Sequence, residues 1–197
     1  QSLARVRIAE GGYQVHPNDP GNYNSLGELV GTNHGINAQV YESHIGQPPS
    51  RKDMASMIWD TAANIYRQKY WNAIQGDQIK NQALADIIFD GRVNHGAGIR
   101  LLQEVLGVTV DGIVGPKTLR EINSADPARL YNDYKERRRK YYHALVEQNP
   151  RLGVFLNGWM NRLARFNDYY PQSAGSSGLS LAGGAFAIIF FLIKFKS

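Results

Sequence analysis

The amino-acid sequence predicts an all-α protein with a long N-terminal loop region and an apolar C-terminal tail. Apolar residues recur at helical spacing through most of the 197 residues, and no long segment alternates with the two-residue period of a half-buried strand. Hydrophobic residues make up 43% of the chain, which is enough for one domain of ordinary size or two small ones. Because the chain has no cysteine, packing rather than disulfide bonds must stabilise the fold.

The first half of the chain is expected to contain a short helix, a long loop region and a long helix. Residues 3–10 have helical spacing, and the Gly pair after them tolerates the left-handed conformation of a helix end. Residues 16–49 are rich in Asn, Gly, Pro and Ser, which is typical of an ordered loop with at most short elements. Ser50 stands three residues before Asp53, as in a capping box, and predicts the start of a helix. The residues that it is expected to carry toward the core are Met54, Ile58, Ile65 and Tyr70.

Helix-start signals divide the second half of the chain into several predicted helices. One helix is expected over about 81–94, where a His-Gly pair ends it, and a short amphipathic helix over about 99–106. Pro116 marks the next start, because proline suits the first helical position. Asp126 caps a long helix, again with proline after the cap, that reaches about Gln148. A last helix presents an apolar face formed by Phe155, Trp159, Leu163 and Phe166.

The C-terminal segment has a different composition. Residues 172–178 form a Gly/Ser-rich linker. Residues 179–195 are almost wholly apolar, slightly fewer than the roughly 20 residues that span a bilayer comfortably. Lys194 can reach a headgroup interface, so the segment could still cross. We therefore predict a membrane anchor, and the alternative is a tail that packs on the globular domain or on a partner.

Glu10 stands where the first predicted helix ends. The negative end of that helix and neighbouring aromatic surface would both raise the pKa of its carboxyl group. A raised pKa keeps a carboxylic acid protonated near neutral pH, as a general acid requires when it donates a proton to a glycosidic oxygen. From position alone, a surface glutamate at a helix end is the more common explanation.

Two groups of motifs resemble known families. The first group is Glu10-Gly11-Gly12-Tyr13, Asn18-Asp19-Pro20-Gly21, Thr32-Asn33-His34-Gly35-Ile36 and Tyr70-Trp71. It resembles the N-terminal region of glycoside hydrolase family 108. The second group is Phe89-Asp90-Gly91-Arg92-Val93-Asn94-His95-Gly96, Leu102-Gln103 and Val110-Asp111-Gly112-Ile113-Val114-Gly115-Pro116-Lys117-Thr118-Leu119. It resembles the predicted peptidoglycan-binding domain that usually follows that family.

The two resemblances cover about residues 1–170. They imply a lysozyme-like helical fold, N-acetylmuramidase activity and a catalytic glutamate at Glu10. They also imply a catalytic region at 1–80 and a helical peptidoglycan-binding region at 81–171. The chain departs from the family at residues 22–31, an insertion-like stretch that alters the loop over the substrate. Family members have also been named secretion activators.

Glycoside hydrolysis commonly uses a second carboxylate as base, nucleophile or charge stabiliser. Asp19 is the candidate because it lies in the same loop region as Glu10, and its alternative role is an Asx turn that holds the Asp-Pro-Gly bend. The candidate substrate-binding side chains are Tyr13, Thr32, Asn33, Tyr70, Trp71, Asp90 and Asn94. Core packing is the alternative for the aromatic side chains, and structural hydrogen bonding is the alternative for the polar ones.

Composition and spacing also bear on partners. The net charge of +5 favours an anionic polymer without identifying it. The five histidines lack zinc-protease spacing and there is no Gly-rich phosphate loop, so we expect no metal or cofactor. The basic residues 135–140 lie beside tyrosines and would suit nucleic acid. Because they surround the helix and Glu136 interrupts them, we instead expect a solvated surface that faces wall or lipid, and no nucleic acid.

We therefore predict a peptidoglycan hydrolase that cleaves the β-1,4 bond between N-acetylmuramic acid and N-acetylglucosamine. It is expected to be a monomer that binds peptidoglycan glycan strands in the bacterial cell envelope, or a phage-encoded lysis protein. Two alternatives stay open. One is a lytic transglycosylase, for which one acid suffices because the sugar's own C6 hydroxyl attacks. The other is a non-catalytic protein that binds the wall or assists secretion.

Overall fold

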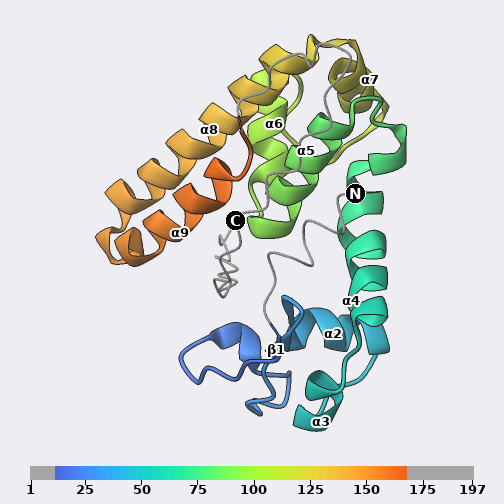
Figure 1. The fold of residues 1–197 in the computed structure, drawn as a ribbon, viewed down its shortest axis with the longest axis vertical. Coiled ribbons are helices and arrows are strands. Elements are labelled where there is room, and N and C mark those ends of the chain that lie inside the picture. Colours follow the sequence, from blue (N-terminus) through green and yellow to red (C-terminus); the bar gives the residue numbers. More distant parts are fainter. Residues whose placement is uncertain (1–11, 168–197) are drawn as a thin grey trace. The chain divides into compact units, whose positions relative to one another are not determined.

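The computed structural model describes residues 12–167, which are mostly helical (Figure 1). This confirms the predicted all-α class. The expected helix over 3–10, with Glu10, and the expected linker and membrane anchor over 172–195 lie outside the described residues. Within the part that is described, no helix is both long and apolar enough to cross a membrane.

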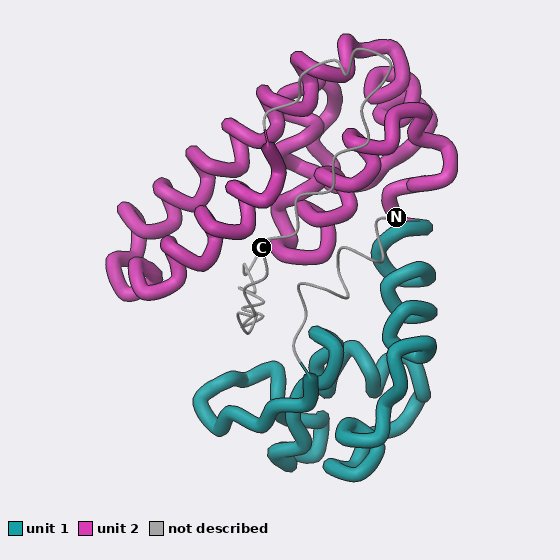
Figure 2. The backbone as a smooth tube through the Cα atoms, viewed as in Figure 1, with its two compact units in different colours: residues 1–72, 179–197 teal, residues 73–178 magenta. Residues whose placement is uncertain are grey.

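The described chain forms two compact units, residues 12–72 and residues 73–167, which are coloured separately in Figure 2. The division between Asn72 and Ala73 differs from the predicted boundary at residue 80. A compact unit and a functional domain need not share a boundary, so the regions 1–80 and 81–171 stay a prediction.

The first unit begins with the expected ordered loop region, whose elements are short except for one helix. Its elements are the 3-10 helix η1, Pro20–Asn22, the strands β1, Thr32–Asn33, and β2, Ile36–Asn37, and the helix α2, Ala38–Ile45. The two strands pair antiparallel, and His34 and Gly35 between them both have positive φ, as a type I′ hairpin turn requires. The sequence did not predict α2, because its cap Asn37, whose Oδ1 accepts from the Val40 amide at 2.8 Å, is also a common loop residue.

The helix expected after Ser50 is interrupted. The chain forms α3, Arg51–Ala55, α4, Trp59–Tyr66, and the π-helical segment η2, Arg67–Trp71. The predicted capping box is confirmed, since the Ser50 amide donates to Asp53 at 2.8 Å and the Asp53 amide donates to Ser50 Oγ at 3.2 Å. Met54 and Ile65 are buried as predicted. The prediction for Ile58 is wrong: it precedes α4 as its N-cap and is 63% exposed.

The second unit contains the helices that the start signals predicted. They are α5, Gln82–Asn94, α6, Gly98–Leu106, α7, Pro116–Ser124, α8, Pro127–Gln148, and α9, Gly153–Ala164, with the 3-10 helices η4, Gly76–Gln78, and η5, Pro150–Leu152. Another 3-10 helix, η3, Asn72–Ile74, lies at the division between the units. Asp126 caps α8 by accepting from the Arg129 amide at 2.7 Å. The last helix ends before Phe166, which is nevertheless buried.

The core of the second unit lies among α5, α6 and α8. A Cβ atom on Gly98 would collide with the main chain of Gly91, and one on Gly91 would collide with the Tyr134 hydroxyl. The absence of side chains at these two positions therefore allows the helices to approach closely. Tyr134 is fully buried and donates to the Gly98 carbonyl at 3.0 Å. At the other end of α8, helix α9 packs against it around Tyr142, Leu145 and Leu163 (Figure 1).

Candidate active site

The described residues that follow Glu10 enter a buried polar cluster centred on Asn22. Gln14 and Thr32 exchange main-chain hydrogen bonds of 2.9 Å as an antiparallel bridge. Asn22 is fully buried, and its Oδ1 accepts from Thr32 Oγ1 at 2.6 Å. Its Nδ2 donates to Gln14 Oε1 at 3.2 Å. One side chain therefore joins the segment that leads to Glu10 to strand β1.

Asp19 lies in the same loop and is only 6% exposed. Its Oδ1 accepts from the Gly21 amide at 2.9 Å and caps η1. Its main-chain carbonyl accepts from the Asn22 amide at 3.0 Å. This is the Asx-turn geometry that the Asp-Pro-Gly sequence suggested as the structural alternative. The carboxylate is therefore held in one orientation beside the Asn22 cluster.

Thr32 and Asn33 are both buried in β1. Asn33 Nδ2 donates to the Met54 carbonyl at 2.9 Å, which attaches the hairpin to α3. His34 at the hairpin tip adds two further links, because its Nε2 lies 3.1 Å from the Met57 carbonyl oxygen and its own carbonyl accepts from Tyr66 at 3.1 Å. The hairpin that carries Thr32 is thus rigidly attached to the helices behind it.

The predicted aromatic residues divide into core and partly accessible positions. Trp71 is only 9% exposed, as the core-packing alternative requires. Tyr13 is half-buried and donates its hydroxyl to the Val30 carbonyl at 2.9 Å. Tyr70 is also half-buried, with its ring centroid 5.8 Å from that of Tyr66. Of the three, Tyr13 and Tyr70 therefore have the surface that a sugar could contact.

Asn22 and Asn24 organise the insertion-like stretch and were not among the predicted site residues. Asn24 Oδ1 accepts from the main-chain amides of Leu26 and Glu28, each at 3.0 Å. Its Nδ2 donates to the Pro49 carbonyl at 3.0 Å. Both asparagines are buried. No local pattern in a stretch rich in Asn and Gly distinguishes buried asparagines from solvated ones, so a single sequence could not identify them.

Asp90 and Asn94 belong to the second unit, where Asp90 forms a buried charge cluster. Its Oδ2 lies 2.7 Å from Arg138 Nη2, and its Oδ1 lies 2.7 Å from Arg162 Nε. Asn94 Nδ2 donates to Asp90 Oδ1 at 3.0 Å. Burial alone would raise the pKa of Asp90, but the charges of Arg162 and Arg138 outweigh it and hold the pKa below its ordinary value.

Arg138 corrects the expectation that residues 135–140 form a solvated surface. It is completely buried, whereas Arg137 pairs with Glu104 and Arg139 pairs with Glu136 near the surface. One residue of the basic segment is therefore part of the core. Within residues 12–167, no group of His, Asp and Glu side chains is arranged to hold a metal ion.

His95 follows α5 and stacks on Tyr141, with ring centroids 5.4 Å apart. Both ring nitrogens are buried and lack a hydrogen-bond partner among the residues that the structure describes. Burial, reinforced by the charge of Arg138, lowers the pKa of His95 to about 3.

The stability of the second unit is therefore expected to fall as the pH drops below about 6.5, because the unfolded chain then protonates His95 and the folded chain does not until pH about 3. The free energy of unfolding should decrease by up to about 1.4 kcal/mol per pH unit. Urea unfolding between pH 7 and pH 5 measures this slope. His95→Phe should reduce this slope, and an unchanged slope in that variant would contradict the assignment.

Two protein families match the chain, in the same order as the two groups of sequence motifs. Residues 3–96 match the family described as glycosyl hydrolase 108, and residues 97–164 match the predicted peptidoglycan domain. The chain is similar to the solved structure of SagA from Brucella abortus, with 28% identity and a TM-score of 0.70, over 84% of this chain and 88% of that one. Among curated proteins, none matches the chain significantly. The two family matches confirm the resemblance and its order.

Proposed function

We propose that this chain is an N-acetylmuramidase that cleaves the β-1,4 bond between N-acetylmuramic acid and N-acetylglucosamine, because residues 3–96 match the glycosyl hydrolase 108 family and a peptidoglycan domain follows them. The first match supports a glycoside hydrolase, and the peptidoglycan domain after it supports peptidoglycan as the partner in a cell-envelope or phage context. The order of these two matches carries the proposal. The similarity to SagA supports a fold shared with that protein.

Glu10 is the proposed general acid. Four Cα–Cα steps, which reach at most about 14 Å, separate it from Gln14. Gln14 is bridged to Thr32 and bonded to Asn22. This short connection allows the carboxyl groups of Glu10 and Asp19 to lie about 5 to 9.5 Å apart, the separation that glycosidases use.

Asp19 and Thr32 are proposed to act on the sugar from the side opposite to the proton donor Glu10. A carboxylate with a fixed orientation can stabilise the positive charge that develops on the sugar, since it does not have to reorganise. Thr32 donates its hydroxyl hydrogen to Asn22, so its lone pairs can accept a hydrogen bond from the attacking water. Burial of both residues supports these roles, because charge interactions are stronger away from solvent.

Asp19→Asn is expected to lower turnover at least about tenfold with little change in melting temperature. Asparagine can still accept from the Gly21 amide and preserve the turn, but it has no negative charge. Turbidity loss of wall suspensions and thermal melts measure the two effects. Asp19→Ala, which loses the cap as well, should show both losses. Full turnover in Asp19→Asn would mean that Asp19 only holds the turn.

Mass spectrometry of digested peptidoglycan tests the proposed reaction. Reducing N-acetylmuramic acid ends are expected, because water attacks in a hydrolase. Products with 1,6-anhydro ends would instead establish the lytic transglycosylase. Intact wall after incubation with folded protein would favour the non-catalytic alternative that binds the wall or assists secretion.

A further inference from the structure

Helix α7 in the second unit separates two adjoining pockets whose linings have opposite charge. Ser124, at the end of α7, lines both pockets. Its hydroxyl donates to the Arg120 carbonyl at 2.9 Å. Both pockets lie entirely within residues 73–167. Their volumes are about 350 and 400 Å³, which are within the range of small-ligand sites.

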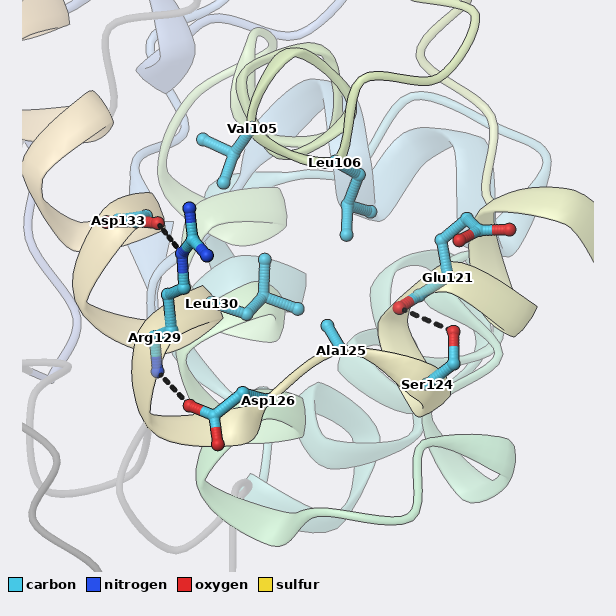
Figure 3. A pocket seen from close by; sticks show the side chains of 9 residues that line it. All are labelled: Val105, Leu106, Glu121, Ser124, Ala125, Asp126, Arg129, Leu130 and Asp133. Atoms are coloured by element: carbon cyan, nitrogen blue, oxygen red, sulfur yellow. Dashed lines mark hydrogen bonds and ion pairs between the residues drawn. The ribbon is translucent and has the colours of Figure 1, made fainter.

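The first pocket lies between α6, α7 and α8 and has an apolar floor with an acidic rim. Leu106, Ala125 and Leu130 point into the space between these elements (Figure 3). The charged lining groups are three carboxylates and one guanidinium, those of Glu121, Asp126, Asp133 and Arg129. Arg129 Nε lies 3.5 Å from Asp133. Glu121 Oε1 lies 3.4 Å from Arg120 Nε, and these two side chains are 38% and 67% exposed. Because such exposed ion pairs contribute little stability, Glu121 and the exposed carboxylate of Asp126 can still accept a cation from a ligand.

The second pocket lies on the other side of α7 and is basic and amide-rich. Lys80 and Arg120 are its charged lining residues, and both are exposed. The Lys80 amide donates to Asn123 Oδ1 at 2.8 Å, and Asn123 Nδ2 donates to the Gln78 carbonyl at 2.8 Å. These bonds hold the loop that carries Lys80 against α7, so the main-chain positions of Lys80 and Arg120 are fixed relative to each other.

We propose that the two pockets bind the peptide stem of peptidoglycan, with a stem ammonium group at the acidic pocket and a stem carboxylate at the basic pocket. The inference rests on the proposed action on peptidoglycan and assigns a second contact to that substrate. A stem peptide carries alanine methyl groups, the side-chain ammonium of lysine or diaminopimelate, and free carboxylates. Those three features match the apolar floor and the two opposite charges.

The glycan strand fits these pockets poorly. Its amino groups are acetylated and therefore uncharged, so they offer no cation to the acidic rim. Neither pocket has an aromatic side chain among the described residues that line it, although sugar rings usually stack on aromatic faces. The peptide portion of the wall is therefore the better occupant.

Calorimetric titration of the full chain with the free tetrapeptide L-Ala-γ-D-Glu-diaminopimelate-D-Ala tests the proposal. Binding is expected, and acetylation of the diaminopimelate side-chain amine should weaken it about threefold to fivefold, the scale of one partly exposed ion pair. Amidation of the carboxylates should weaken it similarly. The uncharged sugar oligomer chitotetraose should not compete for these pockets.

Charge-removing variants locate the two contacts. Asp126→Asn should weaken tetrapeptide binding about threefold to fivefold and reduce the effect of amine acetylation, while asparagine still caps α8. Lys80→Gln should reduce the effect of carboxylate amidation, and both variants leave the ion pair between Arg120 and Glu121 intact. The matched control, Glu147→Gln with Arg151→Gln, alters exposed charges elsewhere and should bind as the unmodified chain does.

Two results would overturn the proposal: no tetrapeptide binding by the unmodified chain, or equal binding by the pocket variants and the control. Failure of the muramidase assignment is distinguishable from either. Tetrapeptide binding without wall cleavage would support the peptide-binding pockets and contradict the muramidase assignment. Wall cleavage without tetrapeptide binding would support the muramidase assignment and contradict the peptide-binding pockets.

Discussion

Glu10→Gln is expected to lower the rate of wall hydrolysis by at least about a hundredfold, the usual scale for loss of a general acid. Glutamine has nearly the same shape as glutamic acid but has no acidic proton to donate to the glycosidic oxygen. Zymography and turbidity loss of wall suspensions measure activity. Circular dichroism and the melting temperature should be unchanged, which separates a chemical effect from unfolding.

Asp60→Asn is the matched control for this variant. Asp60 is an exposed carboxylate in the first turn of α4, and its replacement should leave wall hydrolysis intact. A folded Glu10→Gln protein with full activity would remove Glu10 from the mechanism. Equal losses in both variants would point to a general effect of charge on wall binding.

Asp90→Asn is expected to destabilise the second unit by about 3 to 5 kcal/mol, because it leaves the buried guanidinium charges of Arg138 and Arg162 without their counter-ion. Arg138 is 0% exposed and Arg162 is 12% exposed, so water cannot replace the carboxylate. Urea unfolding at neutral pH, followed by circular dichroism, measures the loss.

Glu136→Gln provides the comparison for Asp90→Asn. It removes an ion pair with Arg139 whose two side chains are 55% and 41% exposed, and it should cost less than about 1 kcal/mol. Asp90→Asn should also retain wall hydrolysis below its melting temperature. A loss of hydrolysis at unchanged stability would mean that Asp90 contacts the substrate, which is the role that the sequence motif suggested.

The helix starts could be predicted because their signals are local. Ser50, Asp126 and Pro116 act within one turn of the residues that they organise, and the structure confirms each of them. The same reasoning missed α2, whose cap lies in a stretch rich in loop-forming residues. It also joined α3 and α4, because helical spacing of apolar residues continued across their interruption and placed Ile58 on the buried face.

The candidate site was only partly predictable. Sequence motifs selected Asp19 and Thr32, and turn chemistry explained the local geometry of Asp19. Asn22, which joins Thr32 to Gln14, has no distinguishing local signal. Its role depends on three segments that approach one another only after folding. The roles of Glu10 and the other site residues stay predictions for the variants described above to test.

The basic segment of α8 shows most clearly what the sequence alone could not predict. Arg137, Arg138 and Arg139 are indistinguishable in sequence, and their composition indicates a solvated face. In the structure, Arg138 alone of the three is completely buried, since it faces Asp90, 48 positions earlier in the chain. Local sequence determined that this segment is helical. Which side of the helix is buried depends on how α5 and α9 pack against it, because only that packing brings a distant carboxylate to one of three equivalent cations.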